Sequence, residues 1–361
     1  MEVRAPMADS LKWDVFVSAQ IQAVVSDLPP GATEMRWSPI SSTLISGERD
    51  AVLIDTAITV EQNLKLADWI AASGKNLTTI YATHGHGDHF FGVNTIRQRF
   101  PNARFVATRE VIAAMQKQAS DPVVNAYWKV RFPEQIDSTL VIADELKDGV
   151  IELEGKQLIS VPLGHTDTDN TTCVHVPSIS LVVAGDGAYN DVHLHLGEST
   201  TETRKEWIAA LDTIESLKPS AVVAGHKRPG APDTPNIIEE TRKYIRDFDT
   251  AAAKTQTALE LYRRMIELLS RAIEPGCVVV FGTSHQTGTL NVRRPGDDQR
   301  VIALGWGNVP SWLCRHSAKN ADESANSEES ARHRLVSHWL HTIATGTAHC
   351  TTATAIARSR P

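Results

Sequence analysis

The stretch Thr83-His84-Gly85-His86-Gly87-Asp88-His89 places four potential metal ligands within six residues, at the end of a β-prone run at 77–83. The first two histidines alternate after this run, so their side chains share one face of the chain. The two glycines permit a tight turn, because glycine adopts backbone angles that other residues avoid. That turn brings Asp88 and His89 to the start of the next helix. One short loop can therefore supply two metal centres.

Strands and helices alternate on both sides of this motif. Strands are expected at 42–46, 51–54, 157–162, 171–176, 179–184 and 221–224. Helices are expected from 59 to about 74, at 88–100, at 109–118, from 203 to the stop at Pro219, and over most of 236–271. Helices in these places can cover both faces of a sheet, which predicts a layered α/β domain.

Two of the helices carry a capping-box signature at their start. Thr59 with Gln62 and Thr203 with Glu206 have the required spacing. In the first helix the expected apolar face is Val60, Leu64, Ala67 and Ala71, and in the second it is Trp207, Leu211 and Ile214. The run 119–133, with Tyr127, Trp128 and Phe132, is either a lid or a packed helix.

An HxHxDH motif placed directly after an apolar strand resembles the metallo-β-lactamase superfamily. The resemblance covers about residues 35–230 and extends through the helices to about 272. It implies a four-layer αββα sandwich with a two-metal site on loops at strand ends. It also implies further ligands downstream, and the sequence offers His165 in Gly-His-Thr-Asp, Asp186 in Gly-Asp-Gly and His226 in Gly-His-Lys.

The resemblance assigns a role to each candidate. It implies that His84, His86 and His165 hold the first metal, that Asp88, His89 and His226 hold the second, and that Asp186 bridges the two. Asp55, at the end of the strand 51–54, corresponds to an acidic residue that orients a ligand without binding metal.

Imidazole and carboxylate ligands without thiolate suit zinc, and also iron or manganese. Two zinc ions per chain are expected, since zinc is the commonest metal of the superfamily. Such a pair lowers the pKa of a shared water from about 15.7 toward about 7, and the resulting bridging hydroxide attacks a carbonyl. Asp88 could also orient this hydroxide.

The expected substrate is a small cyclic amide or ester, a lactam or lactone, in xenobiotic detoxification or secondary metabolism. The chain looks similar to fungal γ-lactamases that open benzoxazolinone-type rings. A thioesterase or a phosphoesterase or nuclease of the same superfamily is the alternative, and a non-hydrolytic iron oxygenase is another. A formal charge of −7 disfavours nucleic acid as a partner, although cations beside His226 (Lys227 and Arg228) would favour a phosphoester.

Several residues near the predicted site have two interpretations. Tyr189 or His193 could hydrogen-bond a tetrahedral oxyanion, or could simply pack. Trp128 could line an apolar pocket, but core packing is the stronger interpretation. Cys173 lies in a β run, which favours a small buried apolar role over that of a nucleophile.

Composition sets the expected organisation. We divide the chain into an N-terminal lead-in at 1–34, the metal-binding domain at 35–274 and a tail at 275–361 of unknown structure. No run of 18 apolar residues occurs, which predicts no membrane partner. Four cysteines without CxxC spacing and no signal peptide predict a cytoplasmic protein. The sequence does not determine the oligomeric state.

Overall fold

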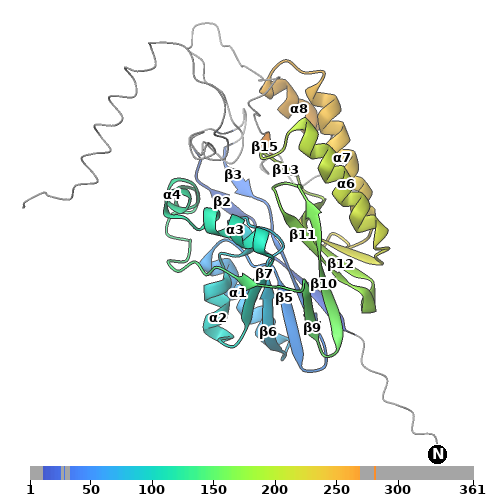
Figure 1. Cartoon of the computed structure of the whole chain (residues 1–361). Coiled ribbons are helices and arrows are strands. Elements are labelled where there is room, and N and C mark those ends of the chain that lie inside the picture. The colour runs from blue at the N-terminus through green and yellow to red at the C-terminus, as the bar shows by residue number, and fades with distance from the viewer. Residues whose placement is uncertain (1–10, 26–27, 29–32, 269–279, 282–361) are drawn as a thin grey trace, which may run out of the picture. The chain divides into compact units, whose positions relative to one another are not determined.

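Two β-sheets lie face to face between two layers of helices (Figure 1), in a computed structural model that describes residues 11–25, 28, 33–268 and 280–281. The first sheet has the order β1 (Lys12–Val17), β4 (Ser41–Ser46), β5 (Asp50–Ile54), β6 (Asn76–Tyr81), β7 (Arg104–Ala107) and β8 (Asp144–Glu145). Strands β1, β4 and β5 pair antiparallel, and β5 to β8 pair parallel. The lead-in thus provides an edge strand of this sheet.

The second sheet has the order β14 (Ala221–Lys227), β12 (Leu181–Asn190), β11 (Thr171–Val176), β10 (Lys156–Gly164) and β9 (Val150–Leu153). Its only parallel pair in the described part of the chain is β12 with β14, so the carboxyl ends of these two strands meet at one edge. Two small sheets pair β2 (Ile21–Ala23) with β3 (Met35–Trp37) and β13 (His195–Leu196) with β15 (Val280–Phe281).

Alternating side chains divide the apolar core into three layers. On β5, Val52 and Ile54 face the second sheet, where they join Val183 and Val223. Leu53, between them, faces the helices α1 (Val60–Ala72), α2 (Val93–Arg99) and α3 (Arg109–Gln118). The outer face of the second sheet packs on α6 (Thr201–Ser216), α7 (Asn236–Ala252) and α8 (Ala258–Leu268). This period-two burial produces the predicted four-layer α/β sandwich.

The start of α1 is confirmed, but its predicted apolar face is only partly right, since Ala67 is buried while Val60 and Ala71 are half-buried. Thr59 caps the helix and forms a capping box with Gln62. The buried face consists of Gln62, Asn63, Leu66, Ala67 and Ile70, while Leu64 is 51% exposed. Polar side chains occupy two buried positions because Gln62 bonds the cap and Asn63 donates to Ala57 O and Thr59 O. Local hydrogen bonding therefore outweighs hydropathy here.

The predicted cap of α6 is also wrong, since the helix begins earlier. Thr200 is the N-cap, and its box partner is Thr203, whose hydroxyl accepts from Thr200 N at 2.8 Å. The apolar face of Trp207, Leu211 and Ile214 is buried as predicted. The helical segment 236–271 is broken between α7 and α8.

The run 119–133 packs into the core. It consists of α4 (Asp121–Val123), a π-helical turn at Val124–Trp128 and α5 (Lys129–Arg131). The Trp128 ring is fully buried, and its Nε1 donates to Gln118 at 2.9 Å. Single 3₁₀ turns lie at Gly87–His89 and Pro177–Ile179.

The tail at 275–361 lies outside the described residues except for β15, and so does the proposed boundary at 274. None of the helices in the described part of the chain has the length and apolarity needed to cross a membrane.

Candidate metal centre

The motif loop leaves β6 and turns tightly against α3. Gly85 is essential to this path, because a Cβ there would lie 2.3 Å from Ala114 Cβ. The loop is fastened to the second sheet, since Thr83 O accepts from the backbone N and the hydroxyl of Thr172 at 2.9 and 2.7 Å. These bonds bring the ligand-bearing ends of the two sheets together.

Asp186 and His226 come from the parallel pair β12 and β14. The register shifts between Gly185 and Tyr189, so the pairing of β12 is irregular along the stretch that carries Asp186. Gly225 makes room for the carboxylate, because a Cβ there would lie 2.0 Å from Asp186 Oδ1. The ring of Tyr189 stacks on His226, with centroids 5.5 Å apart and planes at 15°.

Four groups of side chains place ligand atoms within 4.8 Å of one another in the described residues. They are His84, His86 and Asp167; His84, His89 and Asp186; Asp88, His89 and His226; and His86, His195 and Glu198. Six of the seven predicted ligands thus meet in one buried cluster. The seventh, His165, is in none of these groups, but its Nε2 is buried without a hydrogen-bond partner.

A network around Asp55 fixes the orientation of two rings. Its carboxylate accepts from Thr83 N and Thr83 Oγ1, both at 2.8 Å. Because the hydroxyl proton goes to Asp55, Thr83 Oγ1 accepts from His84 Nδ1 at 3.0 Å. Asp55 also accepts from His89 Nδ1 at 3.2 Å. Both rings therefore turn Nε2 toward the cluster.

The other three histidines have an acceptor on one ring nitrogen as well. His226 Nδ1 donates to Pro39 O at 3.1 Å, and His165 Nδ1 donates to Asp169 at 2.6 Å. His86 is reversed, since its Nε2 faces Glu198 Oε1 at 3.2 Å. Its Nδ1 faces Asp167 inside the cluster. An outer acceptor that holds the far nitrogen is the usual arrangement of a metal-binding histidine.

The atoms that face one another inside the cluster are nearly all acceptors. Asp186 lies 3.3 Å from both His89 Nε2 and His226 Nε2, and Asp88 Oδ2 lies 3.4 Å from His226 Nε2. Buried atoms without a hydrogen-bond partner are Nε2 of His84, His89 and His165, Oδ1 of Asp88 and Asp186, and Oδ2 of Asp167. Buried polar atoms are normally paired. These residues fit metal cations, which would satisfy them together.

The charges of the cluster act strongly on one another. Burial opposes ionisation of Asp186, but His226 and His89 hold its pKa well below its usual value. Burial likewise lowers the pKa of His89, yet Asp186 and Asp88 raise it to about 9. The carboxylates thus attract positive charge onto the imidazoles. Metal cations take the place of such protons when they bind.

The remaining predicted residues lie in different surroundings. The Tyr189 hydroxyl donates to Asp186 Oδ2 at 2.7 Å, at the edge of the cluster. His193 packs on Tyr244 instead, with its Nδ1 3.1 Å from that hydroxyl, and burial lowers its pKa to about 4. Cys173 is fully buried, and burial raises the pKa of its thiol to about 12, which agrees with an apolar role.

Sequence reasoning missed three contributors: Asp167, Glu198 and Trp37. The indole Nε1 of Trp37 donates to Asp88 Oδ2 at 3.1 Å and its ring packs on Phe132. Asp167 had a signal, because it lies two residues after His165 and so within reach of the same site. Glu198 and Trp37 had none, since both come from distant segments without a motif.

Comparison with known proteins agrees with this architecture. Residues 35–226 match the family model of the metallo-beta-lactamase superfamily. A metallo-beta-lactamase family protein from Thermus thermophilus shares 19% identity, with a TM-score of 0.50 over 72% of this chain and 89% of that one. A metallo-beta-lactamase from Pontibacter korlensis shares 17% identity, with a TM-score of 0.45 over 63% of this chain and 100% of that one. The search of curated proteins found no match.

Proposed function

The chain belongs to the metallo-β-lactamase superfamily, and we propose that it is a hydrolase with two zinc ions. In this proposal the first metal is held by His84, His86 and His165, the second by Asp88, His89 and His226, and Asp186 lies between them. The fold together with the His/Asp cluster indicates a metal-dependent hydrolase. The zinc identity, the count of two and the individual ligand roles are the proposal.

One observation carries it: the imidazoles of His84, His86, His89 and His226 each have one nitrogen held by an outer acceptor while the other lies inside a buried site lined with carboxylates. A structural cluster of histidines would show hydrogen bonds between its members. Here the inner atoms Asp88 Oδ1, Asp186 Oδ1 and His84 Nε2 have no partner. When bound, two divalent cations would lower the pKa of water and polarise a carbonyl.

The chain's own residues prepare that site. Asp55 and Thr83 keep Nε2 of two histidines free of the proton that would block a metal. Trp37 and Tyr189 each donate to a ligand carboxylate, Asp88 and Asp186 respectively, and so restrict its rotation. We assign Tyr189 to this positioning task. An oxyanion contact from His193 stays a prediction that its packing against Tyr244 does not favour.

The proposed substrate is a small neutral or weakly charged molecule, with a cyclic amide or ester as the favoured class. The two cations that would favour a phosphoester are already paired. Lys227, only 3% exposed, pairs with Asp233, and Arg228 pairs with Asp191. Phosphate groups would therefore compete with carboxylates for both cations, which weakens the nuclease and phosphoesterase alternative. Cytoplasmic location remains a prediction from the cysteine pattern.

Metal quantification followed by a hydrolysis screen tests the function. Two zinc per full-length chain and turnover of a lactone, γ-lactam or cyclic carbamate would support it. Thioesters and bis-aryl phosphodiesters belong in the same screen, because their turnover would select the alternatives. His86→Ala is the inactive variant, and His175→Ala on β11 is its control because that histidine belongs to none of the four groups. A single iron per chain would refute the proposal and favour oxygen chemistry.

A further inference from the structure

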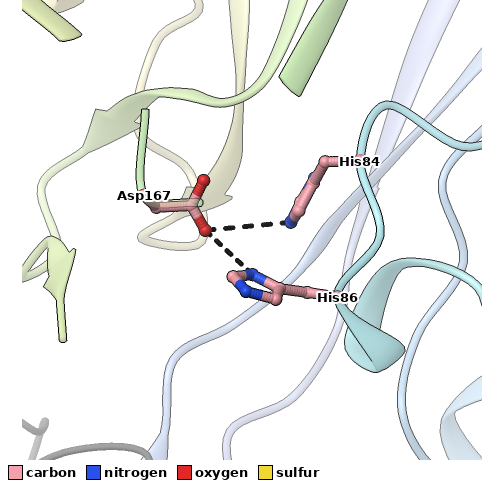
Figure 2. Close-up of side chains that lie close together, drawn as sticks. All are labelled: His84, His86 and Asp167. Atoms are coloured by element: carbon pink, nitrogen blue, oxygen red, sulfur yellow. Dashed lines mark ion pairs between the residues drawn. The ribbon is translucent and has the colours of Figure 1, made fainter. Parts of the chain in front are cut away.

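Asp167 reaches two motif histidines with a single oxygen. Figure 2 shows its carboxylate, from the β10–β11 connection, facing the rings of His84 and His86. The Oδ2 atom lies 2.9 Å from His86 Nδ1 and 3.9 Å from His84 Nε2. The side chain is fully buried. Three ligand atoms from two loops thus surround one point.

A proton does not account for all three atoms. His84 Nδ1 donates to Thr83 Oγ1, which leaves an acceptor lone pair on Nε2 in the neutral ring. An Asp167–His86 ion pair would leave this nitrogen unsatisfied. Moreover, Oδ2 faces His86 Nδ1 at 2.9 Å and has no other hydrogen-bond partner. A cation between the three atoms would satisfy each of them.

The other side of Asp167 is held in place. Its Oδ1 accepts from the Thr166 hydroxyl at 2.9 Å, and its ion pairs among the described residues are with His84 and His86, not with lysine or arginine. Burying a carboxylate without a partner costs several kcal/mol, so such a group is normally paired or bound to metal. The fixed Oδ1 therefore directs Oδ2 at the histidine pair.

We propose that Asp167 is a direct ligand of the first metal, together with His84 and His86. This inference rests on the proposed function, and it adds a third carboxylate to Asp88 and Asp186. Two divalent cations carry four positive charges, and the three carboxylates balance three of them. Carboxylate ligands suit harder metals better than imidazole does, so Asp167 broadens the site toward manganese or iron.

A cysteine at position 167 gives a positive signal for coordination. In cobalt-loaded Asp167→Cys the thiolate would bind the metal and produce an intense sulfur-to-cobalt charge-transfer absorption. Asp14→Cys is the matched control, because Asp14 is exposed on β1 and belongs to none of the four ligand groups. The wild-type chain, with four cysteines, sets the baseline. The proposal predicts the absorption in the first variant alone, and its absence there overturns the proposal.

The isosteric Asp167→Asn measures the same bond without new chemistry. Zinc affinity from chelator competition should fall more than about 100-fold at one of the two sites, beyond the roughly 10–100-fold typical of an outer partner. A smaller loss in a variant that still binds two metals would overturn the role of Asp167 and leave the proposed function intact. A wild-type chain that binds no metal would overturn both. Asp14→Asn, which removes an exposed charge on β1, is the charge control.

Discussion

Asp55→Asn reverses the proton positions of two histidines at once. Asp55 stands at a backbone φ of 60°, a conformation that asparagine tolerates well, so the substitution keeps the fold of the turn. One oxygen can still accept from Thr83 N. The new amide nitrogen, however, donates where Asp55 accepted from His89 Nδ1 and Thr83 Oγ1. His89 Nδ1 then has to accept.

The consequence spreads to the second ring. With its oxygen accepting from the amide, the Thr83 hydroxyl turns its proton to His84 Nδ1, 3.0 Å away. Both rings then carry their proton on Nε2, the nitrogen that faces the cluster. Loss of an outer partner lowers metal affinity by roughly 10–100-fold. That range corresponds to about 1.4–2.7 kcal/mol, and it should apply to both metals, since His84 and His89 belong to different proposed sites.

Zinc retained after dialysis at fixed free zinc, followed by chelator competition, measures this effect. The matched control is Asp137→Asn, because Asp137 also accepts several hydrogen bonds, from Asn94, Thr95 and Thr139, but belongs to none of the four groups. Wild-type affinity in Asp55→Asn would refute the reasoning about proton positions. A loss at one metal only would refute the coupling through Thr83.

Three further perturbations follow from the same contacts. Metal removal by a chelator should lower the melting temperature, and re-addition of metal should restore it. If the free metal had stood at about 100 times its Kd, the lost stability is about 2.7 kcal/mol. An unchanged melting curve would contradict a loaded site. Gly225→Ala should displace Asp186, because the new Cβ would lie 2.0 Å from Asp186 Oδ1 and 2.7 Å from Gly185 C. The variant should lose about 1–3 kcal/mol of folding stability and should bind less metal. Full metal content would contradict this prediction. The backbone N–H groups of Asp50, Arg49 and Glu48 donate to Glu154 and lower its pKa from 4.5 to about 2. The ionised Glu154 carboxylate therefore stabilises the folded state fully above about pH 4.5, and this stabilisation is lost as the pH falls toward 2. The free energies of unfolding of wild type and Glu154→Gln should therefore converge as the pH falls from about 4.5 toward 2. A constant difference between them would argue against the contact of Glu154 with the turn at 48–50.

The sequence predicted the elements that deliver the ligands because strand ends and glycine turns are local features. The strand 171–176 and the helix 109–118 lie within the predicted bounds. The face of α1 was only partly right because buried Gln62 and Asn63 make hydrogen bonds that hydropathy does not record. Local pattern therefore predicts where an element runs better than which side it buries.

The outer contacts of the site depend on tertiary structure. Pro39 O reaches His226 from 187 residues away in sequence, and Glu198 reaches His86 from 112 residues away. Two histidines that strand alternation would place on one face are also separated: His195, at the start of β13, joins His86 and Glu198, whereas His193, just before the strand, faces Tyr244. No spacing rule in the sequence distinguishes that pair without the path of the loop.

Anomalous X-ray diffraction at the zinc edge, from crystals of the zinc-loaded full-length chain, is the most direct measurement. We expect two peaks, one beside His84, His86, His165 and Asp167, the other beside Asp88, His89 and His226, with Asp186 between the two. No peak in the cluster, or a peak bound elsewhere while these side chains hydrogen-bond to one another, would contradict the two-metal account.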